Sequence, residues 1–273
     1  HRLIFNAIGD ADQCRPALEA AARLVKRSGA PVINDPVAVL KTGRADNTAR
    51  LGKLTGVRAP RMLTLPRALL ASAQGAAMLA DSGLTFPLLL RSPGFHTGRN
   101  FSFVSEARDL PDAIDRLPGD ELLVIEFFDV RDRDGNARKY RVMIVDGKIY
   151  PMHLAISRHW KVHYFTADMA NNTDHRGQDA AFLADMTRMI GKKAVAALAR
   201  IRDDLGLDYG GIDFGLSSSG EVLVFEANAT MVVNPPEADV RWAYRRAGVT
   251  RILDAVSAMI ARRAAERALQ KAG

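Results

Sequence analysis

Two apolar segments joined by a short polar turn constrain the fold of this chain more than any other feature. Residues 211–216 and 221–228 have the apolar composition of buried β-strands, and the sequence Ser217-Ser-Ser-Gly220 between them is typical of a turn. The sequence therefore predicts an antiparallel hairpin. In this hairpin, Asp213 and Glu226 are expected to lie roughly opposite each other.

Three oxygen-bearing side chains are expected at one end of this hairpin. Glu226 and Asn228 are two residues apart, so they project to the same side of their strand. Asp213 is flanked by glycine and apolar residues, which indicates a buried position. Two buried carboxylates repel each other, and a bound cation removes that cost. Since oxygen ligands suit Mg²⁺, these three residues are predicted metal ligands; the alternative is a solvent-exposed hairpin with ordinary carboxylates.

The rest of the chain has the pattern of a mixed α/β protein. A strand at residues 2–8, a helix opening at Pro16 and a second strand at 31–33 predict a small unit with parallel strands. Longer helices are expected at residues 67–80 and 179–205.

We expect three consecutive parts along the chain. Residues 1–59 form an N-terminal α/β domain, residues 60–128 form a central subdomain, and residues 129–273 form a C-terminal subdomain with an antiparallel sheet. The first boundary rests on Ala59-Pro60, which is typical of a domain junction. The last part begins as a meander with a hairpin signal at Asp146-Gly147 and ends in a basic helix.

Composition excludes several classes of protein. Hydrophobic residues make up 48% and charged residues 25%, which is ordinary for a globular chain. The single cysteine, Cys14, excludes an internal disulfide, and no Cys/His cluster indicates zinc, so we expect a reducing, cytoplasmic location. No apolar run approaches the roughly 18 residues of a membrane span, so no membrane partner is expected. The chain begins at His1 rather than Met, which is compatible with an upstream domain in a longer protein.

The net charge of +7 is concentrated at the C-terminus. Residues 241–273 contain eight basic and two acidic side chains, and so carry six of the seven net positive charges. A high isoelectric point by itself favours nucleic-acid binding. Because the positive charge is concentrated on one predicted helix, a solvated helix face is favoured instead, and nucleic acid is not an expected partner. The same amphipathic helix is a candidate surface for a homodimer.

Two further segments are candidate nucleotide contacts. The loop Gly94–Asn100 joins two predicted strands, and its glycines allow backbone N–H groups to approach an anion. The alternative is a hairpin turn with basic side chains. The strand at 121–128 ends at Glu126-Phe-Phe-Asp129, where backbone polar groups beside aromatic rings can hold a purine. The alternative is a core strand that ends at the surface.

The segment 153–172 is unusually rich in basic and aromatic side chains. It contains three histidines as well as Arg158, Trp160 and Lys161. Either it binds an acidic substrate or it is a positively charged surface loop.

The order of these segments resembles that of the ATP-grasp superfamily. The most specific part is Gly211-Ile-Asp-Phe-Gly-Leu followed by Gly220-Glu-Val-Leu-Val-Phe-Glu-Ala-Asn, which resembles the family's metal motif in residues and spacing. The likeness runs from about Val32 to Asn234, and the most similar branch contains glutathione synthetase and the ribosomal-protein glutamate ligases (RimK-like). It implies an α/β fold with a small domain ahead of the ATP-grasp region, a central lid subdomain and a C-terminal antiparallel-sheet subdomain.

The resemblance implies a role for each matching position. Asp213, Glu226 and Asn228 would bind the Mg²⁺, or alternatively Mn²⁺, of a bound ATP. The residues implied to contact ATP itself are Arg91, His96, Gly98 and Arg99 at the phosphates, Glu126, Phe127 and Phe128 around the adenine, and Asp129 near the ribose. Arg141 and Arg158 match arginines that this branch uses near the phosphates and the acyl intermediate, so they are the implied catalytic residues.

The chain departs from the family pattern at three places. The first basic group that contacts ATP has two candidates, Arg44 and Lys53. Gly211 stands where the family usually has an arginine, two positions before the metal-site aspartate. The residues after Asn228 differ from the frequent Asn-x-x-Pro-Gly. These differences concern the oxyanion-stabilising group and the acceptor site.

The resemblance implies an ADP-forming carbon–nitrogen ligase that uses Mg-ATP and an acylphosphate intermediate. Its substrates would be a carboxylate and an amine, each a small molecule or a peptide. Two alternatives remain at this point. One is a phosphotransferase on the same fold, and the other is a catalytically inactive nucleotide-binding module fused to an upstream partner-binding region.

Overall fold

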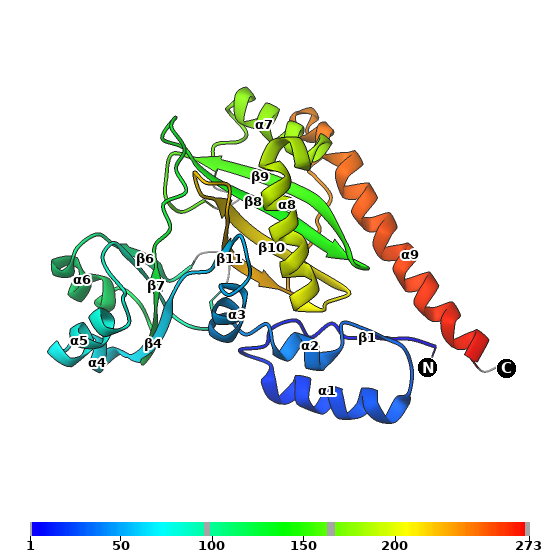
Figure 1. Cartoon of the computed structure of the whole chain (residues 1–273), viewed down its shortest axis with the longest axis horizontal. Coiled ribbons are helices and arrows are strands. Elements are labelled where there is room, and N and C mark those ends of the chain that lie inside the picture. The colour runs from blue at the N-terminus through cyan, green and yellow to red at the C-terminus, as the bar shows by residue number, and fades with distance from the viewer. Residues whose placement is uncertain (1, 96–98, 163–166, 271–273) are drawn as a thin grey trace. The chain divides into compact units, whose positions relative to one another are not determined.

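The structure, a computed structural model, describes residues 2–95, 99–162 and 167–270 (Figure 1). The chain forms two compact units. Unit 1 combines residues 1–58 with residues 130–273, and unit 2 consists of residues 59–129. The N-terminal segment thus shares a unit with the C-terminal part of the chain, and the division into three consecutive parts stays a prediction.

Unit 1 is built on a sheet with the strand order β3-β11-β10-β8-β9. Its strands are β3 (Val57–Arg58), β8 (Ala137–Val145), β9 (Lys148–Ser157), β10 (Tyr209–Leu216) and β11 (Val222–Asn228). Strand β3 runs parallel to β11, and the other neighbours are antiparallel. The hairpin predicted across Ser217–Gly220 is therefore present as β10 and β11. The second hairpin, β8 and β9, turns at Asp146 and Gly147, which both have positive φ (51° and 73°), as a two-residue hairpin turn requires.

Helices α7 (Thr173–Ala184) and α8 (Met186–Leu205) pack against one face of this sheet (Figure 1). The single helix expected at 179–205 was wrong, because Asp185 interrupts it with φ −146° and ψ 87°. The Asp185 side chain accepts a hydrogen bond from the backbone N–H of Arg188 at 2.9 Å, so it caps the start of α8. Side chains of β8 that face these helices, such as Val142 and Ile144, are fully buried.

The opposite face of the sheet is only partly covered by the terminal helix α9 (Arg246–Gln270), which follows a 3₁₀ helix at Val240–Arg245. Met143 and Val145 of β8 pack with Ile252 and Met259 of α9 in one buried cluster. Because side chains alternate along a strand, Lys139 and Arg141 lie on this same face, toward the other end of β8. Away from α9, this face of the sheet therefore carries polar side chains, of which Asp213 and His153 are buried.

The N-terminal segment of unit 1 begins with a parallel pair of strands, as expected, although the first strand is shorter than the predicted 2–8. The segment contains β1 (Ile4–Phe5), α1 (Arg15–Ser28), β2 (Val32–Ile33), α2 (Pro36–Leu40) and α3 (Arg44–Leu51). Buried asparagines attach it to the main sheet. Asn34 exchanges two 2.8 Å hydrogen bonds with the backbone of Tyr209, and Asn47 donates to the carbonyl of Ala227. This attachment brings the start of α3 to the end of β11.

Unit 2 has its own sheet, in the order β4-β7-β5-β6, and its own apolar core. Its elements are β4 (Met62–Pro66), α4 (Arg67–Leu70), α5 (Ala73–Asp81), β5 (Leu88–Arg91), β6 (Phe101–Val104), a 3₁₀ helix (Ala107–Asp109), α6 (Leu110–Asp115) and β7 (Glu121–Glu126). The single helix expected at 67–80 was wrong. Ser72 starts a new helix there, because its side chain accepts a hydrogen bond from the backbone N–H of Gly75 at 3.2 Å.

Candidate functional site

A row of polar side chains crosses four neighbouring strands of unit 1. The strand register places Glu226 opposite Asp213, Asp213 opposite Arg141, and Arg141 opposite His153. The predicted juxtaposition of Asp213 and Glu226 is therefore observed. A row of this kind brings side chains from distant parts of the chain onto one line across the sheet.

Asp213 is the buried centre of this row. Its side chain is only 4% exposed, and both of its oxygens accept hydrogen bonds from basic side chains of β8. Arg141 donates from Nε to Oδ1 at 2.5 Å and from Nη2 to Oδ2 at 2.8 Å, and Lys139 donates to Oδ2 at 2.9 Å. Burial alone raises the pKa of the Asp213 carboxyl, but the charge of Lys139 and the hydrogen bond from Arg141 outweigh it. The resulting pKa lies well below the ordinary value, so the carboxylate is ionised near neutral pH.

Lys139 was missed by the sequence analysis, which selected Arg141 alone from the same strand. The spacing in Lys139-Tyr140-Arg141 contained the signal, because residues two apart on a strand face the same side. Tyr140 points instead into the core, where it stacks on Phe214 with ring centroids 5.3 Å apart. The apolar residue between the two basic ones therefore fixes which way they both point.

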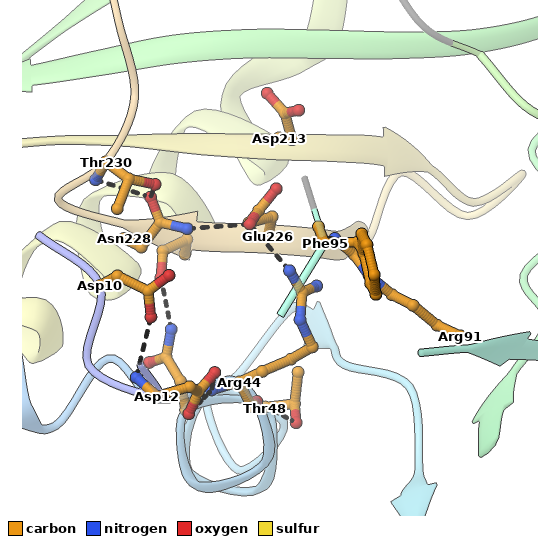
Figure 2. A network of polar contacts seen from close by, with 12 residues as sticks. Asp10, Asp12, Arg44, Thr48, Arg91, Phe95, Asp213, Glu226, Asn228 and Thr230 are labelled. Carbon is orange, nitrogen blue, oxygen red and sulfur yellow. Dashed lines mark hydrogen bonds and ion pairs between the residues drawn. The ribbon is translucent and has the colours of Figure 1, made fainter. Parts of the chain in front are cut away.

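Glu226 and Asn228 form a second, connected polar group at the end of β11 (Figure 2). Asn228 donates from Nδ2 to Glu226 Oε1 at 3.0 Å, and its Oδ1 accepts from the backbone N–H and the hydroxyl of Thr230 at 2.9 and 2.7 Å. Arg44 also donates to Glu226 Oε1, at 2.9 Å. Asn228 thus holds the Glu226 carboxylate from one side and Arg44 holds it from another.

Arg44 reaches Glu226 because it is the first residue of α3, which the N-terminal segment places beside β11. The Asp12 carboxylate accepts hydrogen bonds from the Arg44 backbone N–H at 3.0 and 3.2 Å (Figure 2), which satisfies a donor at the start of the helix. Of the two basic residues considered from the sequence, Arg44 therefore contacts the candidate site. Lys53 lies beyond the end of α3 and is exposed.

His153 ends the row on β9 and is buried, with 4% of its surface exposed. Burial, reinforced by the charge of Arg141, lowers its pKa well below the ordinary value, so its imidazole is neutral at pH 7. From the sequence, His153 opened the basic and aromatic segment 153–172. In the structure it belongs to the buried strand β9, where its side chain faces Arg141.

Gly211 leaves no room for the arginine that the family pattern has at this position. A Cβ atom on Gly211 would lie 2.6 Å from Met231 Cγ and 3.1 Å from Met143 Sδ. Met231 is buried, so it cannot easily move aside. In this chain the basic groups beside Asp213 come from the neighbouring strand β8 instead.

The donor chemistry of the three candidate ligands fits a magnesium ion, since it consists of two carboxylates and an amide oxygen. The protein already uses most of these atoms. Both oxygens of Asp213 accept from the basic side chains of β8, and Oδ1 of Asn228 accepts from Thr230. In the described part of the chain, hydrogen bonds to Glu226 reach only its Oε1. Among the same residues, no group of three or more His, Cys, Asp or Glu side chains is arranged to hold a metal.

In unit 2, the predicted phosphate loop joins β5 and β6, which form an antiparallel pair. Arg91, the last residue of β5, donates to the carbonyl of Phe95, and its guanidinium lies 5.8 Å from the ring centroid of Phe101. Arg99 is exposed. His96 and Gly98 lie outside the described residues. The nucleotide roles of these four residues stay predictions.

The predicted adenine strand of unit 2 ends earlier than expected, at Glu126. The Glu126 carboxylate accepts a hydrogen bond from the backbone N–H of Arg61 at 3.0 Å. The backbone N–H of Glu126 in turn donates to the carbonyl of Arg61 at 2.9 Å. Phe127 packs edge-on against Phe103, with ring centroids 5.0 Å apart, and Phe128 is half-buried. Asp129 is exposed.

The second candidate catalytic arginine, Arg158, follows the last residue of β9 and is exposed. Part of the basic and aromatic loop after it, residues 163–166, lies outside the described residues. Near the end of this loop, Arg176 donates to the carbonyls of Met169 and Ala170 at 3.0 and 2.7 Å, so it ties the loop to α7. Whether the loop binds an acidic substrate stays a prediction.

Comparisons with known proteins bear on the fold. The sequence matches no protein-family model and no curated protein. Its structure is similar to that of the D-alanine–D-alanine ligase from Bacillus anthracis in complex with ATP, with a TM-score of 0.55, 13% identity, and coverage of 90% of this chain and 75% of that one. The VanG D-Ala:D-Ser ligase from Enterococcus faecalis gives a TM-score of 0.55 and 17% identity, over 94% of this chain and 72% of that one.

The ATP-grasp ligase PsnB, solved with the precursor peptide PsnA2 and AMPPNP, gives a TM-score of 0.50 and 17% identity, over 94% of this chain and 76% of that one. These likenesses show that the chain has the fold of ATP-grasp ligases, so the mixed α/β class expected from the sequence is confirmed. In the described part of the chain, no helix has the length and apolar character that spanning a membrane requires.

Proposed function

We propose that this protein is an ATP-dependent ligase that joins a carboxylate to an amine. The observation that carries the proposal is the cluster around Asp213. This chain has the fold of ATP-grasp ligases, and within that fold Lys139 and Arg141 hold the buried carboxylate of Asp213, which lies opposite Glu226. The fold supports ATP as a substrate, since the D-alanine–D-alanine ligase with the same fold was solved with ATP and PsnB with AMPPNP.

The charge of this cluster suits a bound triphosphate. Three basic groups, on Arg44, Lys139 and Arg141, face only the two carboxylates of Asp213 and Glu226 in these ion pairs. The excess of positive charge lies in a partly buried environment, where it attracts phosphate oxygens more strongly than in open solvent. Mg²⁺ held by the carboxylate and amide oxygens of the cluster would supply further positive charge to the phosphates.

The proposed chemistry needs no nucleophile from the protein. An oxygen of the substrate carboxylate attacks the γ-phosphorus of ATP, ADP leaves, and an acylphosphate forms. The amine then attacks the acyl carbon, inorganic phosphate leaves, and the nitrogen loses a proton to give the amide. Lys139 and Arg141 offset the negative charge on the transferred phosphoryl group, and Asp213 holds them in position. Arg158 is proposed to assist at the acyl intermediate.

Unit 2 carries further groups that we propose as nucleotide contacts. Its candidate groups are the basic residues Arg91 and Arg99 with the loop between them for the phosphates, and the backbone at 126–129 for the adenine and ribose. The side chain of Glu126 is already paired with Arg61, at 3.4 Å, which leaves backbone groups rather than this carboxylate as the adenine contact. We further propose that the substrates resemble those of the glutathione synthetase and RimK-like branch, in which a small molecule or a peptide provides the carboxylate.

The proposal is tested by measuring ADP release from Mg-ATP over a panel of carboxylates and amines. ADP release that requires both substrates is expected, and Asp213→Ala and Glu226→Ala should abolish it. Glu221→Gln is the matched control, because Glu221 lies at the turn end of the same hairpin and its carboxylate bonds to Ser219. Full activity in either alanine variant refutes the proposed site.

Two other outcomes identify the alternatives. ATP consumption with a hydroxyl acceptor and no amine indicates a phosphotransferase. Binding of ATP without turnover over the whole panel indicates a regulatory nucleotide-binding module.

A further inference from the structure

We infer that the ammonium group of Lys139 takes the place of a divalent cation beside Asp213, so that the protein binds a single metal ion per nucleotide, on Glu226. This inference rests on the proposed function, since it concerns the metal that accompanies ATP. It changes the role of Asp213 from a metal ligand to the residue that positions two phosphate-binding side chains.

The two carboxylates of the cluster differ in how many of their oxygens accept hydrogen bonds. Both oxygens of Asp213 are occupied by three donors from Lys139 and Arg141, at 2.5 to 2.9 Å. Glu226 accepts its hydrogen bonds in the described part of the chain on Oε1 alone, from Arg44 and Asn228. A metal that binds Glu226 can therefore use an oxygen that the protein does not already occupy, whereas a metal at Asp213 has to displace a buried basic group.

Electrostatics favour the same assignment. Asp213 together with Lys139 and Arg141 carries an excess of one positive charge, which repels a divalent cation. Glu226 with Arg44 is neutral in sum, and the amide of Asn228, which donates to Glu226 Oε1, adds no charge. Moving a divalent ion toward Asp213 is therefore less favourable than placing it at Glu226.

Burial makes the Lys139 contact persistent rather than incidental. The side chain of Lys139 is 14% exposed and that of Asp213 is 4% exposed. Withdrawing the ammonium would leave a buried carboxylate with less compensation, which is strongly unfavourable. Sites with two metals hold the ions about 3.5–4 Å apart. In this chain the Lys139 ammonium already occupies Oδ2 of Asp213, the oxygen that a second ion would need.

The test counts Mn²⁺ ions bound to the protein in the presence of AMPPNP, by electron paramagnetic resonance of free Mn²⁺ and by equilibrium dialysis. The wild-type complex is expected to hold a single Mn²⁺ per chain. Asp213→Asn is expected to keep it with an affinity within about threefold, and Glu226→Gln is expected to weaken it by about tenfold or more. Lys139→Met is expected to admit a second Mn²⁺ beside Asp213.

Each result decides between the possibilities. Two Mn²⁺ ions in the wild-type complex, or equal losses in the Asp213 and Glu226 variants, overturn the inference and leave the proposed function standing. A single Mn²⁺ in both wild type and Lys139→Met overturns the assignment to Lys139. No nucleotide-dependent Mn²⁺ binding in the wild type refutes the proposed function, and the inference fails with it. The comparison of Asp213 with Glu226 stays decisive if the lysine variant does not fold.

Discussion

Replacing Arg141 with methionine should destabilise unit 1 by about 3 kcal/mol, because it leaves a buried carboxylate with half of its cationic partners. Arg141 provides two hydrogen bonds to Asp213, at 2.5 and 2.8 Å, and the Asp213 side chain is 4% exposed. Removing one partner of a buried ion pair costs about 3–5 kcal/mol. Lys139 remains at 2.9 Å from Oδ2 and still compensates part of the charge, which places the expected loss at the lower end.

The assay is urea unfolding followed by far-ultraviolet circular dichroism, with the free energy of unfolding obtained by linear extrapolation. A double-mutant cycle with Asp213→Asn isolates the interaction from the general effect of each substitution. Since Arg141 and Asp213 are in direct contact, the double variant should lose about 2 kcal/mol less than the sum of the two single variants. Arg241→Met is the control, because the side chains of the Arg241–Asp239 pair are 45% and 34% exposed, so this pair should contribute far less to the free energy of unfolding than the buried pair.

The reasoning is refuted by either of two results. One is a loss below about 1 kcal/mol in Arg141→Met, which would place the pair among the weak surface pairs. The other is strict additivity in the cycle, which would mean that the buried carboxylate does not depend on this guanidinium.

Three further predictions concern the same unit. Because the pKa of Asp213 lies below its ordinary value, the unfolded chain takes up a proton at this residue at a higher pH than the folded chain does. The free energy of unfolding should therefore fall as the pH is lowered from about 5, and less steeply in Asp213→Asn, as urea titrations at several pH values would show. Gly211→Ala should cost about 1–3 kcal/mol, because the added methyl meets buried methionine side chains, whereas Gly177→Ala, which meets nothing within 4 Å, should not destabilise in the same unfolding assay. Arg44→Met should raise the KM for ATP in the ADP-release assay by about tenfold, the loss of one charged hydrogen bond, while the exposed Lys53→Met should leave it unchanged.

The hairpin of β10 and β11 could be predicted from the sequence because everything that defines it is local. The turn at 217–220 sets the pairing of the two strands, and that pairing places Asp213 opposite Glu226. The β8–β9 hairpin follows from Asp146-Gly147 in the same way. The same local logic failed where a polar residue stopped a helix, at Ser72 and Asp185, because helical periodicity continues across both positions.

The partners of the two carboxylates could not be read from local pattern. Lys139 is 74 residues from Asp213, and Arg44 is 182 residues from Glu226, so neither contact leaves a periodic signal. Each depends on which strands or helices become neighbours in the folded sheet. Once the strand order and the pairing of Asp213 with Arg141 are known, strand alternation places Lys139 on the same face as Arg141, within reach of Asp213.

Gly211 shows why a motif defined along one strand can mislead. The resemblance to the ATP-grasp pattern suggests that a basic group is missing, because the arginine expected two positions before Asp213 is replaced by glycine. The Met231 side chain fills the space beside Gly211, where a side chain at position 211 would otherwise lie. The positive charge beside Asp213 is supplied by Lys139 and Arg141, from a strand that pairs with β10 rather than from β10 itself. The basic partners of Asp213 are therefore found by following the strand register across the sheet to β8, and not by following the sequence of β10.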